Sequence, residues 1–372
     1  MTYTSPITVP NEAPSVSRVN AFDLARGLAV IFMIMIHVLN FYGTPEVQTG
    51  TFGTTIQTLV DWPSASVFVF IMGILIPLSG KNDLATGFKR AIKLFILGYV
   101  LNLFRSTIPM WLSIQMGLVS YEELGGYTPT SEFFVGDIFQ YAGLTYAVCT
   151  LLRFYISDVR IWSLTAIAII FCSPLTWDTS INWGFSNEFF KLLWGDYTQG
   201  SVFPLFPWLS YCIGGMVLGQ LFKNTKDQSQ FFKKTLFTGI ALILIGSALL
   251  FSNPDYHAPH HLRGGPGLIT TITGFVLIWL CFCRQLVERI KANRAFELFY
   301  LWGQNVTTIF IIHWLLIGWG HMLVGSMMLD TEATILSMAI IMLLSHFLLK
   351  AWLAFKNRST KSNTVSEAVT TS

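Results

Sequence analysis

A single histidine lies deep inside the first apolar stretch of the chain. The stretch RVNAFDLARGLAVIFMIMIHVLNFY, residues 18–42, begins with charged side chains and carries His37 in its hydrophobic run. Because an α-helix has about 3.6 residues per turn, one stripe of this stretch holds Asp23, Arg26, Val30, Met33, His37 and Asn40. His37 then lies roughly 16 Å beyond Arg26, about halfway across a ~30 Å hydrocarbon core. An imidazole there can be a functional acid–base group, or it can stabilise packing through a hydrogen bond to another helix.

The composition predicts a helical membrane protein rather than a soluble or nucleic-acid-binding one. Of the 372 residues, 53% are hydrophobic and 12% are charged, whereas soluble domains carry about 25% charged residues. The five cysteines fall in apolar runs without zinc or disulfide spacing. The loop HAPHHLR holds His257, His260 and His261 but no nearby carboxylate pair, so no metal is expected. The first seventeen residues are polar, and we expect no cleavable signal peptide.

Hydropathy divides the chain into about ten spans, so the expected fold is an all-α, polytopic membrane protein. The spans are about 22–42, 59–79, 88–105, 133–153, 159–175, 202–222, 234–251, 265–284, 298–318 and 333–355. They form one domain, residues 18–355, between tails at 1–17 and 356–372 that are expected to be disordered. Of the 23 Lys and Arg residues, all but Arg105, Lys191 and Arg263 fall on the side of the tails. The positive-inside rule therefore predicts that both termini are cytoplasmic.

This orientation gives each polar side chain a depth in the bilayer. Asp61, Asp137, Gln140 and His313 fall in the outer half of their spans, at about the level of His37 and Asn40. Polar groups inside a bilayer face the bundle interior or a watery cavity. The pattern predicts a polar cavity that opens outward with His37 at its floor. The alternative is a set of interhelical hydrogen bonds that specify packing.

The third span begins with a cluster of cations, FKRAIK, at its cytoplasmic end. Arg90 and Lys93 are three residues apart, so they share one face of the helix. Cations one turn apart suit a polyanion such as a phosphate chain. Ordinary positive-inside charge explains the same cluster equally simply.

The opening stretch resembles the first helix of acyltransferase-3 proteins, in which an Arg-Gly pair precedes a histidine by the same spacing as Arg26-Gly27 and His37. Three further segments resemble heparan-α-glucosaminide N-acetyltransferase and its bacterial relatives. They are DWPSASVFVFIMG at 61–73, GDIFQYAGLTYAV at 136–148 and PLFPWLSYCIGGMVLG at 204–219. The segment WGQNVTTIFIIHWLL at 302–316 is similar to the late helix of that family and carries His313.

The resemblance implies a bacterial inner-membrane enzyme that moves an acyl group, usually acetyl, from cytoplasmic acyl-CoA to a sugar hydroxyl or amine outside. It implies a catalytic histidine and basic residues on the third helix for the CoA phosphates, here Arg90 and Lys93. The heparan-type enzymes place their histidine in the loop after the first span, but residues 43–58 contain none. His37 at the acyltransferase-3 position is therefore the candidate base.

The resulting hypothesis assigns a role to each polar residue. Acyl-CoA is held by Arg26, Arg90 and Lys93, and His37 is the general base or forms an acyl-imidazole. Asp61 or Asp137 orients the imidazole or the acceptor, which is a glycan or another small molecule. The acceptor is bound by Asn40, Gln140 and His313. Membrane lipids surround the protein, and a homodimer is compatible with the pattern. A sugar or lipid-linked-substrate transporter and an inactive scaffold are the alternatives.

Overall fold

The computed structural model describes residues 20–60, 64–79, 83–177, 186–194, 201–258, 264–291 and 293–370. The predicted N-terminal tail and Asp61 lie outside these ranges. Among the described residues all regular structure is helical, apart from isolated bridges between Gly43 and Leu329 and between Gly136 and Ser201. The predicted all-α class is confirmed.

The helices follow one another with short connections. The long ones are α1 (Asn20–Tyr42), α4 (Ala65–Leu78), α5 (Leu84–Asn102), α8 (Ile138–Tyr155), α9 (Val159–Cys172), α11 (Leu205–Lys223), α12 (Gln228–Ser252), α14 (Pro266–Arg289), α15 (Arg294–Gln304), α16 (Val306–Val324) and α17 (Thr331–Thr370). The short ones are α2 (Pro45–Thr49), α3 (Thr51–Val60), α6 (Ile108–Gln115), α7 (Pro129–Phe133), α10 (Ser186–Trp194) and α13 (Pro254–His257). A π-helical turn, η1 (Leu103–Thr107), joins α5 to α6, and a 3₁₀ turn, η2 (Ser173–Thr176), follows α9.

Nine helical stretches of the described chain are long and apolar enough to cross a membrane. They match nine of the ten expected spans. The tenth, expected at 133–153, is the 18-residue helix α8, whose apolar character is weakened by Gln140, Thr145 and Arg153. At the other end of the chain, the structure continues α17 as a helix to Thr370, through the stretch expected to be disordered.

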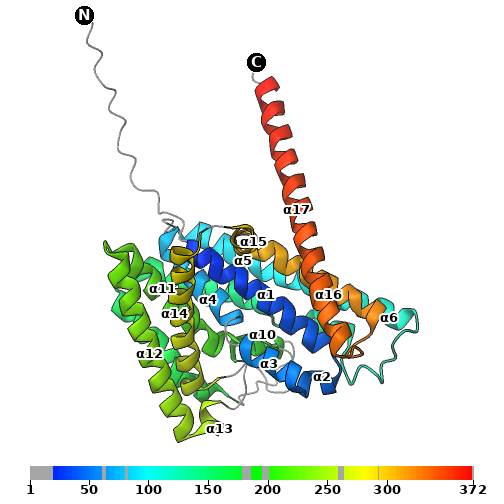
Figure 1. Cartoon of the computed structure of the whole chain (residues 1–372), viewed down its shortest axis with the longest axis horizontal. Helices are drawn as coiled ribbons and strands as arrows, with labels where there is room; N and C mark the ends of the chain where they lie inside the picture. Colours follow the sequence, from blue (N-terminus) through cyan, green and yellow to red (C-terminus); the bar gives the residue numbers. More distant parts are fainter. Residues whose placement is uncertain are drawn as a thin grey trace, which may run out of the picture.

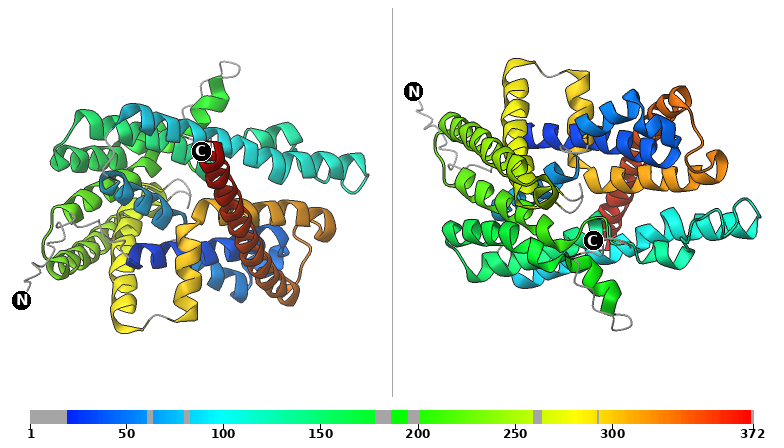
Figure 2. Two further views of the ribbon diagram at one scale, coloured as in Figure 1. Left: turned by 90° about the horizontal axis from the view of Figure 1, so that it is seen from above. Right: turned by 90° about the horizontal axis from the view of Figure 1, so that it is seen from below.

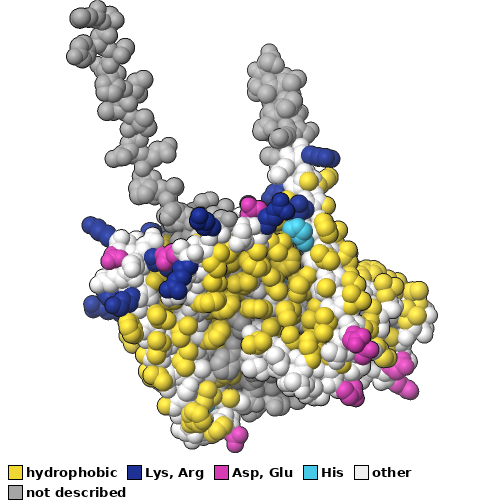
Figure 3. All heavy atoms as spheres, in the orientation of Figure 1, with side chains coloured by type: hydrophobic (Ala, Val, Ile, Leu, Met, Phe, Trp, Pro, Cys, Tyr) yellow, Lys and Arg dark blue, Asp and Glu magenta, His cyan; other side chains and the backbone are white. Residues whose placement is uncertain are grey.

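The visible basic side chains gather at one end of the bundle. Figure 3 shows most of them along the upper edge, where α1 begins and α17 extends away (Figures 1 and 3). Acidic side chains lie both among these basic ones and at the opposite, lower right corner, and the band between the two ends is largely apolar. This distribution has the form that the positive-inside rule describes.

Helix α1 is the centre of one half of the bundle, where it packs against α4, α14, α15, α16 and α17. In the other half α5 packs along α8, and α11 packs against α4 and α9. Figure 2 shows α5 and α6 as one long rod beside the α1 half. The candidate site lies where η1 and α16 bring these halves together.

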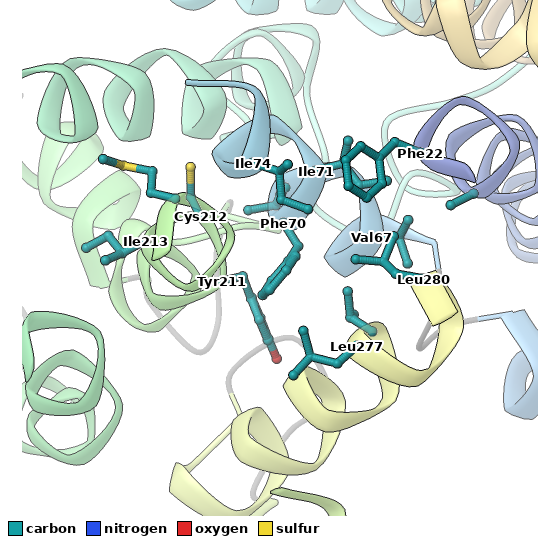
Figure 4. Packing of buried hydrophobic residues seen from close by; sticks show 14 of the residues in the cluster. Phe22, Val67, Phe70, Ile71, Ile74, Tyr211, Cys212, Ile213, Leu277 and Leu280 are labelled. Carbon is teal, nitrogen blue, oxygen red and sulfur yellow. The ribbon is translucent and has the colours of Figure 1, made fainter. Parts of the chain in front are cut away.

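Glycines let α4 and α11 approach until their backbones touch. A Cβ atom at Gly73 would lie 2.0 Å from the carbonyl oxygen of Cys212, and one at Gly215 would lie 2.0 Å from that of Phe70. Around this contact, Phe70, Ile71 and Ile74 of α4 meet Tyr211, Cys212 and Ile213 of α11 (Figure 4). Van der Waals contact between closely packed helices is a main source of stability in membranes.

This contact predicts opposite outcomes for two adjacent glycines. Gly215→Ala is expected to lower the free energy of unfolding by about 3 kcal/mol, and the thermal midpoint with it, because the backbones must separate. Gly214→Ala is the control, since its Cβ would meet only the ring of Phe70, at 3.2 Å. Thermal unfolding of the two variants in detergent measures the difference. Equal midpoints would show that the helices do not pack this way.

Candidate active site

The structure brings His37 of α1 and His313 of α16 into direct contact. Nδ1 of His37 lies 3.0 Å from Nε2 of His313. The ring planes are only 9° apart, and the ring centres are 5.3 Å apart. That separation is longer than face-to-face contact, which is about 3.5–4.0 Å between ring atoms. The two imidazoles therefore lie edge to edge in nearly one plane, the geometry of an in-line hydrogen bond.

Each histidine of this pair has a second set of contacts. Nδ1 of His313 lies 3.0 Å from the carbonyl oxygen of Ile309, one turn earlier in α16, and the side chain is fully buried. The ring of Trp314 lies 4.2 Å from the ring of His37. His37 itself is only partly buried. His313 is thus the fixed member of the pair, while His37 keeps an accessible face.

A buried ion pair lies beside the histidines. Arg105 and Asp137 form an ion pair in which Nη1 of Arg105 lies 2.6 Å from Oδ2 of Asp137, and the guanidinium carbon of Arg105 lies 4.2 Å from the centre of the Trp314 ring. Both charged side chains are buried, with Arg105 6% and Asp137 8% exposed. The Arg105 charge acts electrostatically on both imidazoles. The indole ring of Trp314 therefore contacts Arg105 of the ion pair and His37 of the histidine pair.

Local structure explains why these side chains converge. Arg105 is the middle residue of the π-helical turn η1, an irregularity that is frequent at functional sites. Its backbone carbonyl packs directly on α16, since a Cβ at Gly318 would lie 1.7 Å from it. Asn102 ties the loop before α8 to this turn by donating to the carbonyls of Phe133 and Val135. Asp137 then begins α8 as its N-cap.

A second carboxylate, Glu132 of α7, also lies near Arg105. Burial raises the pKa of the Glu132 carboxyl, and the Arg105 charge opposes that shift. Asp137 adds a further negative charge that favours the protonated form of Glu132.

Of the expected substrate-binding residues, Gln140 is engaged through its side chain, whereas Asn40 is engaged through its backbone. Gln140 is fully buried, and its amide closes a capping box with the Asp137 backbone and donates to the carbonyl of Val135. Asn40 lies at the open end of α1, where its backbone carbonyl accepts from Gln48 of α2. The structure therefore assigns Gln140 to the start of α8.

Arg26 lies away from the other expected donor-binding residues. It pairs with Asp23 on its own helix, and Asp23 accepts a second hydrogen bond, of 3.1 Å, from Gln304 of α15. Asp23 is 2% exposed, so Arg26 neutralises a buried carboxylate at the contact between α1 and α15. Close helix packing beside this group, where Gly303 meets the backbone of Asp23, suits a structural role.

A polar cleft lies at the basic end of α5 and α8. It is shallow and open to solvent, and its lining includes Arg90, Tyr146 and Arg153. Arg90 donates to the Tyr146 hydroxyl across 3.1 Å, and Arg153 donates to the carbonyl of Ile76. Two cations and several hydroxyls make the cleft suited to a phosphate-bearing ligand. Lys93 is exposed and does not line it.

The antiparallel α5–α8 pair carries both centres. Arg90 and Arg105 are separated by about 22 Å along α5 and η1, and α8 runs from Asp137 at one centre to Arg153 at the other. Small residues hold the pair together: a Cβ at Gly143 would lie 2.8 Å from the carbonyl of Ala91. The cleft at Arg90 and Arg153 therefore lies at one end of the α5–α8 pair, and the Arg105–Asp137 ion pair lies at the other end.

The described residues hold no cluster of three or more His, Cys, Asp or Glu side chains that could bind a metal ion. Of the histidine-rich loop, His257 is buried and accepts a hydrogen bond from the backbone N–H of Gly267, whereas His260 and His261 lie outside the described ranges. Asp61 also lies outside them.

Sequence reasoning missed three residues of these centres. Arg105 was counted as a charge in an outer loop because it ends the predicted third span, and Arg153 was counted as an ordinary cytoplasmic charge. Trp314 follows His313 directly but resembles any apolar residue of its span. The one usable signal was the position of Arg105, because an arginine on the outer side breaks the charge asymmetry.

The described chain is thus a helical bundle with membrane-length spans, an imidazole pair between α1 and α16, and a separate cleft lined by two arginines. The family model described as "Heparan-alpha-glucosaminide N-acetyltransferase, catalytic" matches residues 18–252, well over half of the chain. The chain belongs to this family of acetyl-CoA-dependent membrane N-acetyltransferases. The matched region contains His37, Arg90, Arg105 and Asp137, and it ends before the helix that carries His313. No curated protein matches the chain.

Proposed function

We propose that the protein transfers an acetyl group from acetyl-CoA on the cytoplasmic side to an amine or hydroxyl of a sugar on the other side. The observation that carries this proposal is the in-line contact between His37 and His313 inside the membrane-spanning bundle. It leaves the second nitrogen of the partly buried His37 ring for the chemistry. Membership of an acetyl-CoA-dependent family supplies the donor.

The proposed orientation has both termini in the cytoplasm of a bacterial cell. The gathering of Lys and Arg at the end of the bundle from which α17 extends supports it (Figure 3). The cleft at Arg90 then opens to the cytoplasm, where acyl-CoA is made. The polar centre at His37, further along the same bundle, receives the acceptor from the opposite side.

The cleft has the donors that the CoA phosphates require. Arg90, Arg153 and the Tyr146 hydroxyl would hold them, with Thr86 and Thr150 as further hydroxyl donors. Asp83 also lines the cleft, but it caps α5, and hydrogen bonds from Thr86 hold the pKa of its carboxyl below the usual value. Its negative charge opposes phosphate binding, so the two arginines must outweigh it.

The proposed chemistry balances within this centre. The acceptor N–H or O–H gives its proton to His37 as the acceptor atom attacks the thioester carbonyl. The new acyl–nitrogen or acyl–oxygen bond forms, the carbon–sulfur bond breaks, and His37 returns the proton to the CoA thiolate. Nε of Arg105 and Nε1 of Trp314 are buried and have no hydrogen-bond partner within the described part of the chain. They are the donors available for the negative charge on the carbonyl oxygen.

A direct test of this proposal measures CoA thiol release and acetylation together. Purified protein with acetyl-CoA and glucosamine or a glucosamine-terminated oligosaccharide should release thiol only as acetylated sugar accumulates. Acceptors that carry an amine or only hydroxyls separate N- from O-transfer. No binding of acetyl-CoA at all would overturn the proposal.

The cleft predicts which cations bind the donor. Arg90→Gln and Arg153→Gln should each weaken acetyl-CoA binding by about 10- to 100-fold, since a hydrogen bond to a charged group contributes about 1.5–3 kcal/mol. Lys93→Gln, on the same helix but outside the cleft, is the matched control with a smaller effect. Titration with acetyl-CoA, and with CoA lacking its 3′-phosphate, measures the losses. A greater loss for Lys93→Gln than for Arg90→Gln would reject the cleft.

A further inference from the structure

The hydrogen bonds of His313 determine which of its nitrogens carries a proton. Nδ1 of His313 lies 3.0 Å from the carbonyl oxygen of Ile309. A carbonyl oxygen only accepts, so this nitrogen must carry the hydrogen. His313 is 0% exposed in an apolar span, and burial there disfavours a charged imidazole. The neutral ring that donates from Nδ1 presents a lone pair at Nε2.

This lone pair in turn determines which ring nitrogen of His37 carries a proton. Nε2 of His313 faces Nδ1 of His37 at 3.0 Å, with the two rings nearly coplanar. Because the His313 nitrogen accepts, the His37 nitrogen must donate. A neutral His37 then has its proton on Nδ1 and an unprotonated Nε2. Among the described residues, Nε2 of His37 makes no hydrogen bond within the protein.

We infer that His313 is a positioning residue: with the Ile309 carbonyl it holds His37 in the tautomer whose Nε2 is free to accept a proton. The chain of donors runs from Nδ1–H of His37 to Nε2 of His313, and from Nδ1–H of His313 to the helix backbone. A neutral imidazole and a carbonyl thus do what a carboxylate does in many acid–base sites. This inference rests on the proposed role of His37 as the base.

The arrangement explains why Asp137, the expected site aspartate that the structure describes, does not need to touch the base. Asp137 is engaged with Arg105 and with the start of α8. A carboxylate beside His37 would add a further buried charge, whereas a neutral partner orients the ring without that cost.

Two substitutions at position 313 separate orientation from packing. A glutamine side chain places its amide near the position of Nε2, so His313→Gln keeps an acceptor for His37. An asparagine places its amide near the position of Nδ1, so His313→Asn keeps the contact with Ile309 and loses that acceptor. Both variants are smaller polar amides, so a purely structural role predicts similar losses for the two.

The test is ¹⁵N NMR of histidine-labelled protein in detergent, together with acetyl-transfer kinetics. The chain has seven histidines, and comparison with His37→Gln assigns the His37 signal. We expect the Nδ1–H tautomer of His37 in the wild type and in His313→Gln, and a mixture of tautomers in His313→Asn. We expect kcat to fall by about 100-fold or more in His313→Asn, to fall less than 10-fold in His313→Gln, and KM for acetyl-CoA to stay unchanged.

An Nε2–H tautomer of His37 in the wild type would overturn the inference, as would equal kcat values for the two variants. The NMR measurement does not depend on turnover. Protein that shows the expected tautomers but transfers no acetyl group would therefore contradict the proposed function while supporting the assignment of the hydrogen bonds.

Discussion

His37→Gln is expected to lower the rate of acetyl transfer by about 10²- to 10⁴-fold, the contribution typical of a general base. The glutamine amide cannot accept and return a proton, and it lies near the position of Nε2 rather than Nδ1, so the hydrogen bond to Nε2 of His313 is lost as well. Binding of acetyl-CoA should be unchanged, because the cleft that contains Arg90 lies at the other end of the α5–α8 pair. Transfer kinetics and donor titration on the same preparation measure both quantities.

The matched control is another histidine of the bundle that accepts a hydrogen bond. His346 of α17 lies with Nδ1 3.2 Å from the indole nitrogen of Trp302, which donates to it. An asparagine oxygen lies near the position of Nδ1 and can accept the same bond, so His346→Asn should keep wild-type kinetics. If His37→Gln transfers acetyl groups at the wild-type rate, His37 has no part in the chemistry.

Arg105→Met is expected to destabilise the protein by about 3–5 kcal/mol, because it leaves the Asp137 carboxylate buried without its counter-ion. The loss should be largely reversed by adding Asp137→Asn. Asparagine removes the unpaired charge and remains a good N-cap for α8. The double variant thereby separates the cost of an uncompensated charge from the loss of the helix cap.

Thermal or denaturant unfolding in detergent measures these differences, with Arg160→Met as the control for removing an arginine. Arg160 is exposed, so its substitution should change stability by less than about 0.5 kcal/mol. Activity is expected to remain low in the double variant, since the donor beside Trp314 is still missing. A single Arg105→Met variant as stable as the wild type would show that the pair is not buried as described.

The depth of each polar residue in the bilayer could be predicted from the sequence. The side of the helix from which its side chain projects could not. Hydropathy and charge asymmetry placed His37 and His313 at one level, and the structure brings them into contact. The same reasoning placed Gln140 at that level but could not show that its amide closes the start of α8. Arg26 and Arg90 share the basic end of the bundle, but Arg26 pairs with Asp23 on α1, whereas Arg90 lines the cleft at the ends of α5 and α8.

Arg105 is the residue of the candidate site that the sequence could least identify, and the reason is physical. A span that ends in a cation predicts a charge at the water interface, because a lone arginine in lipid is costly. The π-helical turn continues the helix past that residue and turns the side chain onto Trp314 and Asp137. The partner that makes burial tolerable comes from a helix over thirty residues later, so no local pattern reveals it.

The central claim is that the bundle transfers an acetyl group and does not transport the sugar. The most direct measurement uses proteoliposomes loaded with radiolabelled acetyl-CoA, with a glucosamine-terminated oligosaccharide outside, for the wild type and His37→Gln. We predict labelled acetyl-oligosaccharide outside and free CoA inside for wild-type vesicles, and neither product for His37→Gln. Unmodified oligosaccharide that accumulates inside, with acetyl-CoA intact, would contradict the proposal and identify a transporter.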